Sequence, residues 1–209
     1  MSIRSRIIKA MSALSDVEFL QLIEGIHAAD LAEVLETFEQ EERSLIFEKL
    51  SPEMAADVLV EFDQDERIEL IASYSSEEIA QELVGNMDSD DAADLLSELS
   101  DDLTREVLSR VEDVEQAKRI AQLLTHEEDT AGALMATELV KVSEDLTALR
   151  CVAAMRNQAE NIDKVHAVYV VNDDEILVGT LSLKKLLTAK RTDNISDLYR
   201  PIEHSVLST

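Results

Sequence analysis

The amino-acid sequence predicts a mixed fold of class α + α/β, in which a right-handed superhelix of helix pairs precedes a small domain of βαββα order. Apolar residues recur in the first half with an offset of 24 or 25 residues. The chain holds only 4 Gly and 2 Pro, which favours helices joined by short turns. After Thr137 the pattern changes to short β-branched runs. At 209 residues, the chain is long enough for two small domains with separate cores.

Residues 1–26 are predicted to form an N-terminal helical segment. The opening MSIRSRIIKAMSAL is basic with some apolar residues, but it lacks the clean apolar run and cleavage site of a signal peptide. No apolar run in the chain approaches the roughly 20 residues that span a bilayer. We therefore expect the chain as given to be soluble.

Residues 27–125 are predicted to form four helix pairs. Within each unit the apolar spacing is i, i+3 or i+4, which is typical of an amphipathic helix. The first helices carry Val34, Leu35 and Phe38; Val58, Leu59 and Phe62; Leu83, Val84 and Met87; and Val107, Leu108 and Val111. The second helices carry Ile46, Phe47 and Leu50; Leu70, Ile71 and Tyr74; Leu95, Leu96 and Leu99; and Ile120, Ala121 and Leu124. Stacked pairs of this kind bury a continuous core between neighbours.

Three short motifs in this half predict helix starts. In LSPEM (50–54), Ser51 is suited to the N-cap and Pro52 to the first helical position. YSSEE (74–78) and LSDDL (99–103) place serine and acidic residues in the same way. The spacing of these motifs agrees with two short helices per repeat.

The second half predicts the βαββα domain. LVKVS (139–143) alternates like a strand, and LTALRCVAAMRNQA (146–159) is typical of a helix. AVYVV (167–171) and ILVGTLSL (176–183) are predicted strands separated by the acidic turn NDDE, and KKLLTAK (184–190) is again helical. This order indicates helices packed on one small sheet.

The negative charge is concentrated in the helical half. The net charge is -26, and residues 27–117 hold 28 Asp and Glu against 5 Lys and Arg, whereas the ratio after residue 125 is 14 to 9. Such a surface repels nucleic acid and anionic lipid and attracts cations or basic proteins. We therefore expect no nucleic-acid partner. Solubility is the simpler explanation of the charge that composition offers.

The stretch DSDDAADLLSEL (88–99) places five carboxylates in twelve residues without a base. With Ser89 as the expected N-cap, Asp90 and Asp91 lie in the first turn, where the helix dipole favours each negative charge by about 0.3–1 kcal/mol. Asp94 and Glu98 follow Asp90 at i+4 and i+8, where each like-charged pair costs about 0.2–0.5 kcal/mol. Mg²⁺ prefers carboxylate oxygens and reverses the sign of that interaction. The stretch lacks the glycine and terminal glutamate of an EF-hand.

Two segments resemble a known family. VYVVNDDEILVGTLSLKKL (168–186) is similar to a cystathionine-β-synthase (CBS) domain. HEEDTAGALMATELVKV (126–142), with T-A-G-x-L-M at 130–135, resembles the cytosolic region of the MgtE family of magnesium channels and transporters. The resemblance implies a superhelical domain over 27–125, a connector over 126–136 and a CBS domain over 137–205. Residues 206–209 then begin a second CBS domain, so we expect a truncated chain that lacks the transmembrane pore domain.

The MgtE resemblance also implies site residues and a role. The matching acidic positions are Asp57 in AADVL, with Asp90 and Asp94 in DDAAD, as ligands of Mg²⁺. Without the resemblance, Asp57 is an ordinary solvated carboxylate. The implied role is a Mg²⁺-sensing region on the cytoplasmic face of the membrane, closing compactly on Mg²⁺ to gate transport. A homodimer through the CBS domains is the expected assembly.

Two other functions stay open at this level. An acidic helical-repeat scaffold could dock onto a basic protein partner. A CBS adenine-nucleotide sensor would use the pattern G-h-x-[ST]-x-x-D, for which Gly179 and Ser182 are in place while Lys185 occupies the carboxylate position. Because that exchange disfavours ribose recognition, Ser182 is expected to cap the following helix instead.

No arrangement typical of an enzyme is found in the sequence. The four histidines, at 27, 126, 166 and 204, are scattered and lack metal-ligand spacing. No pairing of nucleophile and base can be defended. The single Cys151 lies among apolar residues, which indicates helix core and a reducing compartment.

Overall fold

The computed structural model of the chain describes residues 3–11, 16–23, 25–127, 130–158, 165, 167–203 and 205–206. The chain divides into two compact units, Met1–Met135 and Ala136–Thr209, each with its own hydrophobic core. The first is helical and the second combines a sheet with helices, so the predicted fold class is confirmed. Of residues 206–209, which were predicted to begin a second CBS domain, 207–209 lie outside the described residues.

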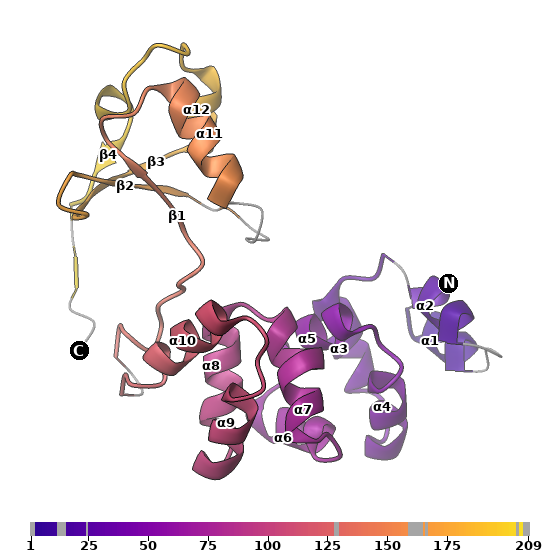
Figure 1. Cartoon of the computed structure of the whole chain (residues 1–209). Helices are drawn as coiled ribbons and strands as arrows, with labels where there is room; N and C mark the ends of the chain where they lie inside the picture. Colours follow the sequence, from indigo (N-terminus) through magenta and orange to yellow (C-terminus); the bar gives the residue numbers. More distant parts are fainter. Residues whose placement is uncertain are drawn as a thin grey trace. The chain divides into compact units, whose positions relative to one another are not determined.

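The helical unit follows the predicted order of short helices, which Figure 1 shows in sequence from indigo to magenta. It begins with α1 (Ile3–Met11) and α2 (Asp16–Ile23). The repeats comprise α3 (Ala28–Leu35), α4 (Gln40–Phe47), α5 (Pro52–Val60), α6 (Gln64–Ile71), α7 (Ser76–Glu78), α8 (Ser89–Ser97), α9 (Asp101–Leu108) and α10 (Val114–Leu123). Between α7 and α8 lie a π-helical segment, η1 (Ile79–Leu83), and a 3₁₀ turn, η2 (Val84–Asn86).

The helices stack in two rows, as expected for helix-pair repeats. The first helices of successive pairs contact one another, α3 with α5, α5 with η1 and α7 with α9, and among the second helices α4 contacts α6 and α8 contacts α10. Leu35, Leu59, Leu83 and Val107 occupy matching buried positions in the first row. The prediction for the last helix was wrong in one detail: Leu123 is buried while Ala121 is exposed, because the buried face continues from Ile120 at i+3.

The helix starts show two alternating kinds of N-cap. Ser51, Ser75 and Ser100 cap first helices, and their hydroxyls accept hydrogen bonds from Met54, Glu78 and Leu103 N–H, as the motifs predicted. The second helices all begin after an acidic N-cap: Glu39, Asp63, Asp88 and Asp113. Asp63 and Asp113 accept hydrogen bonds from backbone N–H groups of the first turn, whereas Glu39 and Asp88 make no such bond. Part of the acidic content therefore serves helix N-termini, where the dipole favours negative charge.

The third pair departs from regular α-helix. The distance in sequence between N-caps is one residue longer from Ser75 to Asp88 than from Ser51 to Asp63. The additional residue is accommodated within the helix as the π segment η1, a feature frequently found near functional sites. The buried Gln116 of α10 secures the 3₁₀ turn η2 that follows, since its Nε2 donates to the carbonyls of Val84 at 3.0 Å and Met87 at 2.9 Å.

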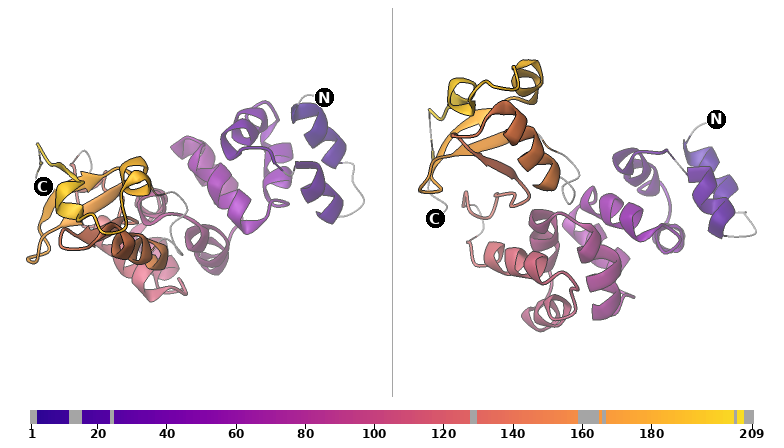
Figure 2. Two further views of the ribbon diagram at one scale, coloured as in Figure 1. Left: turned by 90° about the horizontal axis from the view of Figure 1, so that it is seen from above. Right: turned by 45° about the horizontal axis from the view of Figure 1, so that its top comes forward.

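The second unit is a four-stranded sheet with helices. It comprises β1 (Val140–Ser143), α11 (Ala148–Gln158), β2 (Val168–Val171), β3 (Leu177–Leu181), α12 (Leu183–Thr188), the 3₁₀ turn η4 (Ile195–Asp197) and β4 (Arg200–Pro201). The strand order is β1-β2-β3-β4; β1 and β2 are parallel, and the other neighbours are antiparallel. One core joins the inward-facing strand residues to α11 and α12, and it includes Val140, Val142, Val168, Val170, Leu181, Ala148, Cys151 and Leu186. Figure 2 shows the backbone of this sheet and its helices, in orange to yellow, in two further views.

The short strand β4 was not predicted, and its position explains why residue 179 is a glycine. A Cβ at Gly179 would lie 2.2 Å from Tyr199 Cδ2 and 2.6 Å from the Arg200 carbonyl oxygen. The close pairing of β3 with β4 therefore requires glycine here, independently of any ligand. Ser182 occupies the N-cap position of α12 as predicted, although its hydroxyl makes no capping hydrogen bond.

No helix in the described ranges combines the length and the apolar character needed to cross a bilayer.

Candidate metal site on the acidic helix

Three carboxylates meet at the start of α8. Asp88, Asp90 and Asp91 can each offer one oxygen such that all three oxygens lie within 4.8 Å of one another. Asp88 is exposed, whereas Asp90 and Asp91 are partly buried. Hard divalent cations are held by carboxylate oxygens, and Mg²⁺ keeps several of its waters, so a partly open group of this kind fits such an ion. We call Asp88, Asp90 and Asp91 the α8 cluster.

The structure corrects the predicted start of this helix. The N-cap is Asp88, and Ser89 is the first helical residue. Ser89 is fully buried, and its Oγ accepts a hydrogen bond from Nε of Arg119 on α10 at 3.3 Å. The start of α8 is therefore fixed to α10 by Arg119 as well as by Gln116, and the aspartate of the Asp88–Ser89 pair faces outward.

The pKa of Asp91 is opposite to the expectation based on the helix dipole, which would favour the ionised carboxylate. Partial burial, together with the charges of Asp90, Asp88 and Asp94, raises the pKa of Asp91 to about 6, and Arg67 opposes this only in part. Burial and Asp90 also raise the pKa of Asp94. Near neutral pH these carboxylates are ionised at a cost in free energy, which a bound cation would remove.

Of the three predicted ligands, the structure places only Asp90 in the α8 cluster. Asp94 is exposed one turn further along α8, and Asp57 is exposed in the middle of α5. Asp88 and Asp91 were missed as candidates, because the dipole of the helix offered a sufficient explanation for Asp91 and Asp88 was not considered. Their spacing in DSDD, at the N-cap and first turn of a helix, is the signal that could have found them.

Glu98 is explained by an ion pair rather than by a cation site. Arg67 on α6 forms a two-pronged contact with Glu98: Nε donates to Oε2 at 3.1 Å, and Nη2 contacts Oε1. Both side chains are largely buried, with 19% and 10% exposed. Arg43, at the equivalent position of the preceding repeat, pairs with Glu66 through a single contact from Nη1 to Oε1. The base missing from residues 88–99 is thus supplied by a neighbouring repeat.

The pKa of Asp91 gives a prediction for stability. Because this pKa is raised above the ordinary 3.8, the folded chain binds the proton more tightly than the unfolded chain. The contribution of Asp91 to the free energy of unfolding is therefore highest below about pH 4 and falls as the pH rises through about 6. Asp91→Asn should remove this loss and be more stable than wild type at neutral pH.

The measurement is chemical denaturation across this pH range, with the Asp91 carboxyl followed by carbon NMR. Asp65→Asn, which removes one exposed carboxylate from the first turn of α6, is the control and should keep the wild-type slope. A titration midpoint near 4 for Asp91 would contradict the prediction.

The remaining candidates for chemistry are not members of the α8 cluster. Cys151 is fully buried in α11, and burial raises the pKa of its thiol, as expected for a core residue. His27 is exposed at the N-cap of α3, and His126 is partly buried after α10. His166 and His204 lie outside the described residues.

Each of the two units matches the model of a known protein family. The model of the MgtE intracellular N domain matches residues 26–129, and the CBS domain model matches 131–192. The magnesium transporter MgtE of Enterococcus faecalis is 36% identical over 84 residues, 40% of this chain and 18% of that protein. MgtE of Thermus thermophilus is 30% identical over 89 residues, 43% of this chain and 20% of that protein. The chain thus matches about a fifth of the length of these curated relatives, which are transporters rather than enzymes.

Two solved structures share the fold. The crystal structure of the soluble part of a magnesium transporter has a TM-score of 0.80 and 26% identity, covering 95% of this chain and 77% of that one. The cytosolic domain of the Mg²⁺ channel MgtE in complex with ATP has a TM-score of 0.84 and 24% identity, covering 95% of this chain and 81% of that one.

Proposed function

Because this chain belongs to the MgtE family, with an MgtE intracellular N domain followed by a CBS domain, we propose that it is the Mg²⁺-sensing region of a magnesium transporter or channel, on the cytoplasmic face of the membrane. The observation that carries this proposal is the α8 cluster, in which three carboxylates can meet within 4.8 Å. Asp91 supports it, since burial and like charge make its ionised form unfavourable near neutral pH.

The ligands we propose lie along α5 and α8. Asp57, Asp90 and Asp94 are the positions implied by the family, and Asp88 and Asp91 extend the set around Asp90. One or two carboxylates with retained waters satisfy the octahedral preference of Mg²⁺. These aspartates therefore supply only some of the ligands of each ion, and a second acidic surface supplies the others.

The mechanism we propose is electrostatic. At low Mg²⁺, the acidic helical unit is repelled by acidic residues of the CBS region, and at high Mg²⁺, ions shared between them favour a compact state. In the intact transporter that closure would restrain the pore. A ligand shifts such an equilibrium only by its differential affinity, so the ions must bind the compact state more tightly.

Small-angle X-ray scattering of the chain with and without millimolar Mg²⁺ tests this proposal. The radius of gyration should fall with Mg²⁺ and should change far less with monovalent salt of equal ionic strength. The triple variant Asp57→Ala, Asp90→Ala, Asp94→Ala should lose this response. The matched control removes three exposed carboxylates elsewhere: Glu33→Ala, Glu36→Ala, Glu61→Ala.

Each outcome separates the proposal from its alternatives. An unchanged radius in wild type, or equal responses in the two triple variants, would overturn the Mg²⁺ sensor. A response to ionic strength alone would favour the acidic scaffold for a protein partner. Thermal stabilisation by ATP or AMP without a Mg²⁺ response would favour the nucleotide sensor, despite Lys185 at the expected carboxylate position.

We also propose that the CBS unit pairs with a second copy. Leu149 of α11 and Leu187 of α12 are 56% and 80% exposed, which supports burial of these helices in a homodimer. The forward scattering of the same samples reports the mass of the particle. A monomeric mass at every protein concentration would contradict this assembly.

A further inference from the structure

Arg43 and Arg67 occupy equivalent positions in successive repeats. Their backbone N–H groups donate to the carbonyls of the N-cap residues, Glu39 and Asp63, each at 2.9 Å. The Arg43 side chain, on α4, contacts Glu66 in the first turn of α6. The same pairing one repeat further along the chain would join Arg67 to the first turn of α8.

Asp91 is the residue of α8 that corresponds to Glu66, since each is the third residue after the N-cap of its helix. Arg67 has a different partner. Its guanidinium group forms the two-pronged contact with Glu98, the C-cap residue at the opposite end of α8. The arginine that the preceding repeat would place at Asp91 is therefore held by another carboxylate.

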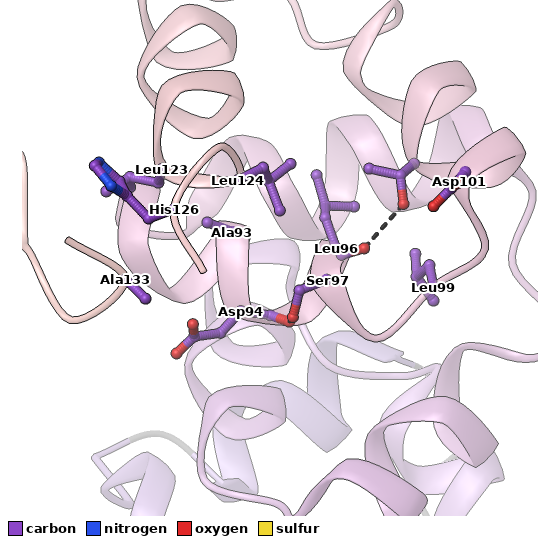
Figure 3. A pocket seen from close by; sticks show the side chains of 11 residues that line it. Ala93, Asp94, Leu96, Ser97, Leu99, Asp101, Leu123, Leu124, His126 and Ala133 are labelled. Carbon is purple, nitrogen blue, oxygen red and sulfur yellow. Dashed lines mark hydrogen bonds between the residues drawn. The ribbon is translucent and has the colours of Figure 1, made fainter. Parts of the chain in front are cut away.

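Glu98 shares a face of α8 with the aspartates that Arg67 could neutralise. Asp94 precedes Glu98 by four residues and Asp91 precedes it by seven, so the three side chains lie on one side of the helix. Figure 3 shows the Asp94 carboxylate pointing away from Leu124, which follows α10. Burial and acidic neighbours raise the pKa of Asp91 and of Asp94, and the charge of Arg67 lowers both in part. The guanidinium group is therefore within electrostatic reach of both aspartates.

Burial favours Glu98 over the aspartates as the partner of Arg67. The Arg67 and Glu98 side chains are both largely buried, whereas Asp91 is partly buried and Asp94 is exposed. A two-pronged contact between arginine and carboxylate is among the stronger hydrogen-bonded pairs, and a buried charge without a partner is costly. Glu98 thus fixes where the positive charge of Arg67 lies.

We propose that Glu98 is a positioning residue, which holds the Arg67 guanidinium group away from Asp91 and Asp94 and so leaves these carboxylates to a divalent cation. Without Glu98, Arg67 turns to the two aspartates and competes with the cation for them. The competition rests on the proposed function, because it requires a cation on α8. The choice of partner by Arg67 does not.

NMR of the Arg67 Nε–Hε group in the metal-free chain tests the choice of partner, because this signal responds to the acceptor of the hydrogen bond. Glu98→Gln keeps the volume of the side chain and removes its charge. In that background, the joint replacement Asp91→Asn, Asp94→Asn should shift the Arg67 signal. In wild type the same two replacements should leave it nearly in place. Equal shifts in the two backgrounds would overturn the proposal.

A Mg²⁺ titration at constant ionic strength, followed by the amide signals of residues 88–92, tests the competition. Glu98→Gln should weaken Mg²⁺ binding about threefold to fivefold, as expected when one ligand gains an ion-pair partner. In the Arg67→Met background the same replacement should have an effect below about twofold, because the competing guanidinium group is gone. The matched control is Asp102→Asn, which releases Arg105 on the surface of α9 and should leave Mg²⁺ binding unchanged.

The outcomes separate the positioning role from the Mg²⁺ sensor. Equal losses of Mg²⁺ affinity from Glu98→Gln in wild type and in Arg67→Met would assign the effect to the lost charge alone and overturn the positioning role. Mg²⁺ binding that Glu98→Gln leaves unchanged would also overturn only this role. Absence of Mg²⁺ binding in wild type would instead overturn the proposed function.

Discussion

Replacement of Gln116 by leucine is expected to lower the free energy of unfolding of the helical unit by about 2–4 kcal/mol, because two buried carbonyls lose their donor. The Gln116 side chain is 8% exposed, and its amide bonds to Val84 and Met87. Leucine is close in volume, so the change removes the hydrogen bonds with little change in packing. Denaturation followed by far-UV circular dichroism measures the loss.

The control is Gln122→Leu, the same change at an exposed position of α10, which should lie within about 0.5 kcal/mol of wild type. Because Gln116 secures the turn that leads into Asp88, hydrogen exchange in the Gln116 variant should rise first over residues 79–88. Equal stabilities of the two variants would show that the carbonyls find other donors and that Gln116 does not fix this turn.

Arg67→Met is expected to lower the free energy of unfolding by about 2–4 kcal/mol, because Glu98 is left as a largely buried charge without a partner. Methionine keeps much of the aliphatic contact, so the effect isolates the guanidinium group. The same change removes the positive charge that partly offsets the raised pKa values of Asp91 and Asp94. Both carboxyls should therefore titrate at still higher pH in this variant.

The matched control is Arg105→Met. Arg105 pairs with Asp102 on the surface of α9, where the side chains are 74% and 92% exposed, so the loss should stay below about 1 kcal/mol. If Mg²⁺ binds the acidic face of α8, it should restore more stability to Arg67→Met than to Arg105→Met. Equal losses of unfolding free energy in Arg67→Met and Arg105→Met would contradict the expectation that the buried ion pair contributes more than the exposed one.

The acidic composition thus has several separate causes. Asp63 and Asp113 cap helices through hydrogen bonds to backbone N–H groups, and Glu98 balances Arg67. Asp91 and, at a smaller degree of burial, Asp94 differ from these, since burial and acidic neighbours disfavour their charges. A cation at the α8 cluster is the explanation we propose for that cost.

The sequence alone determined the order and type of nearly every element. The repeat offset, the serine N-caps and the apolar spacing are local signals, because helix faces and caps depend on residues within one or two turns. The short β-branched runs likewise predicted β1, β2 and β3. The resemblance to MgtE rested on local motifs as well, above all the segment around Thr130–Met135.

Only the tertiary structure decided which charges are compensated and which are not. Arg67 reaches Glu98 across 31 residues, and Gln116 reaches Val84 across 32, so neither contact has a signature in the neighbouring sequence. The two-residue strand β4 is likewise defined by its pairing with β3 rather than by its own pattern. Burial and distant charge together set the free energy of an ionised side chain, and both depend on which helices the fold brings into contact.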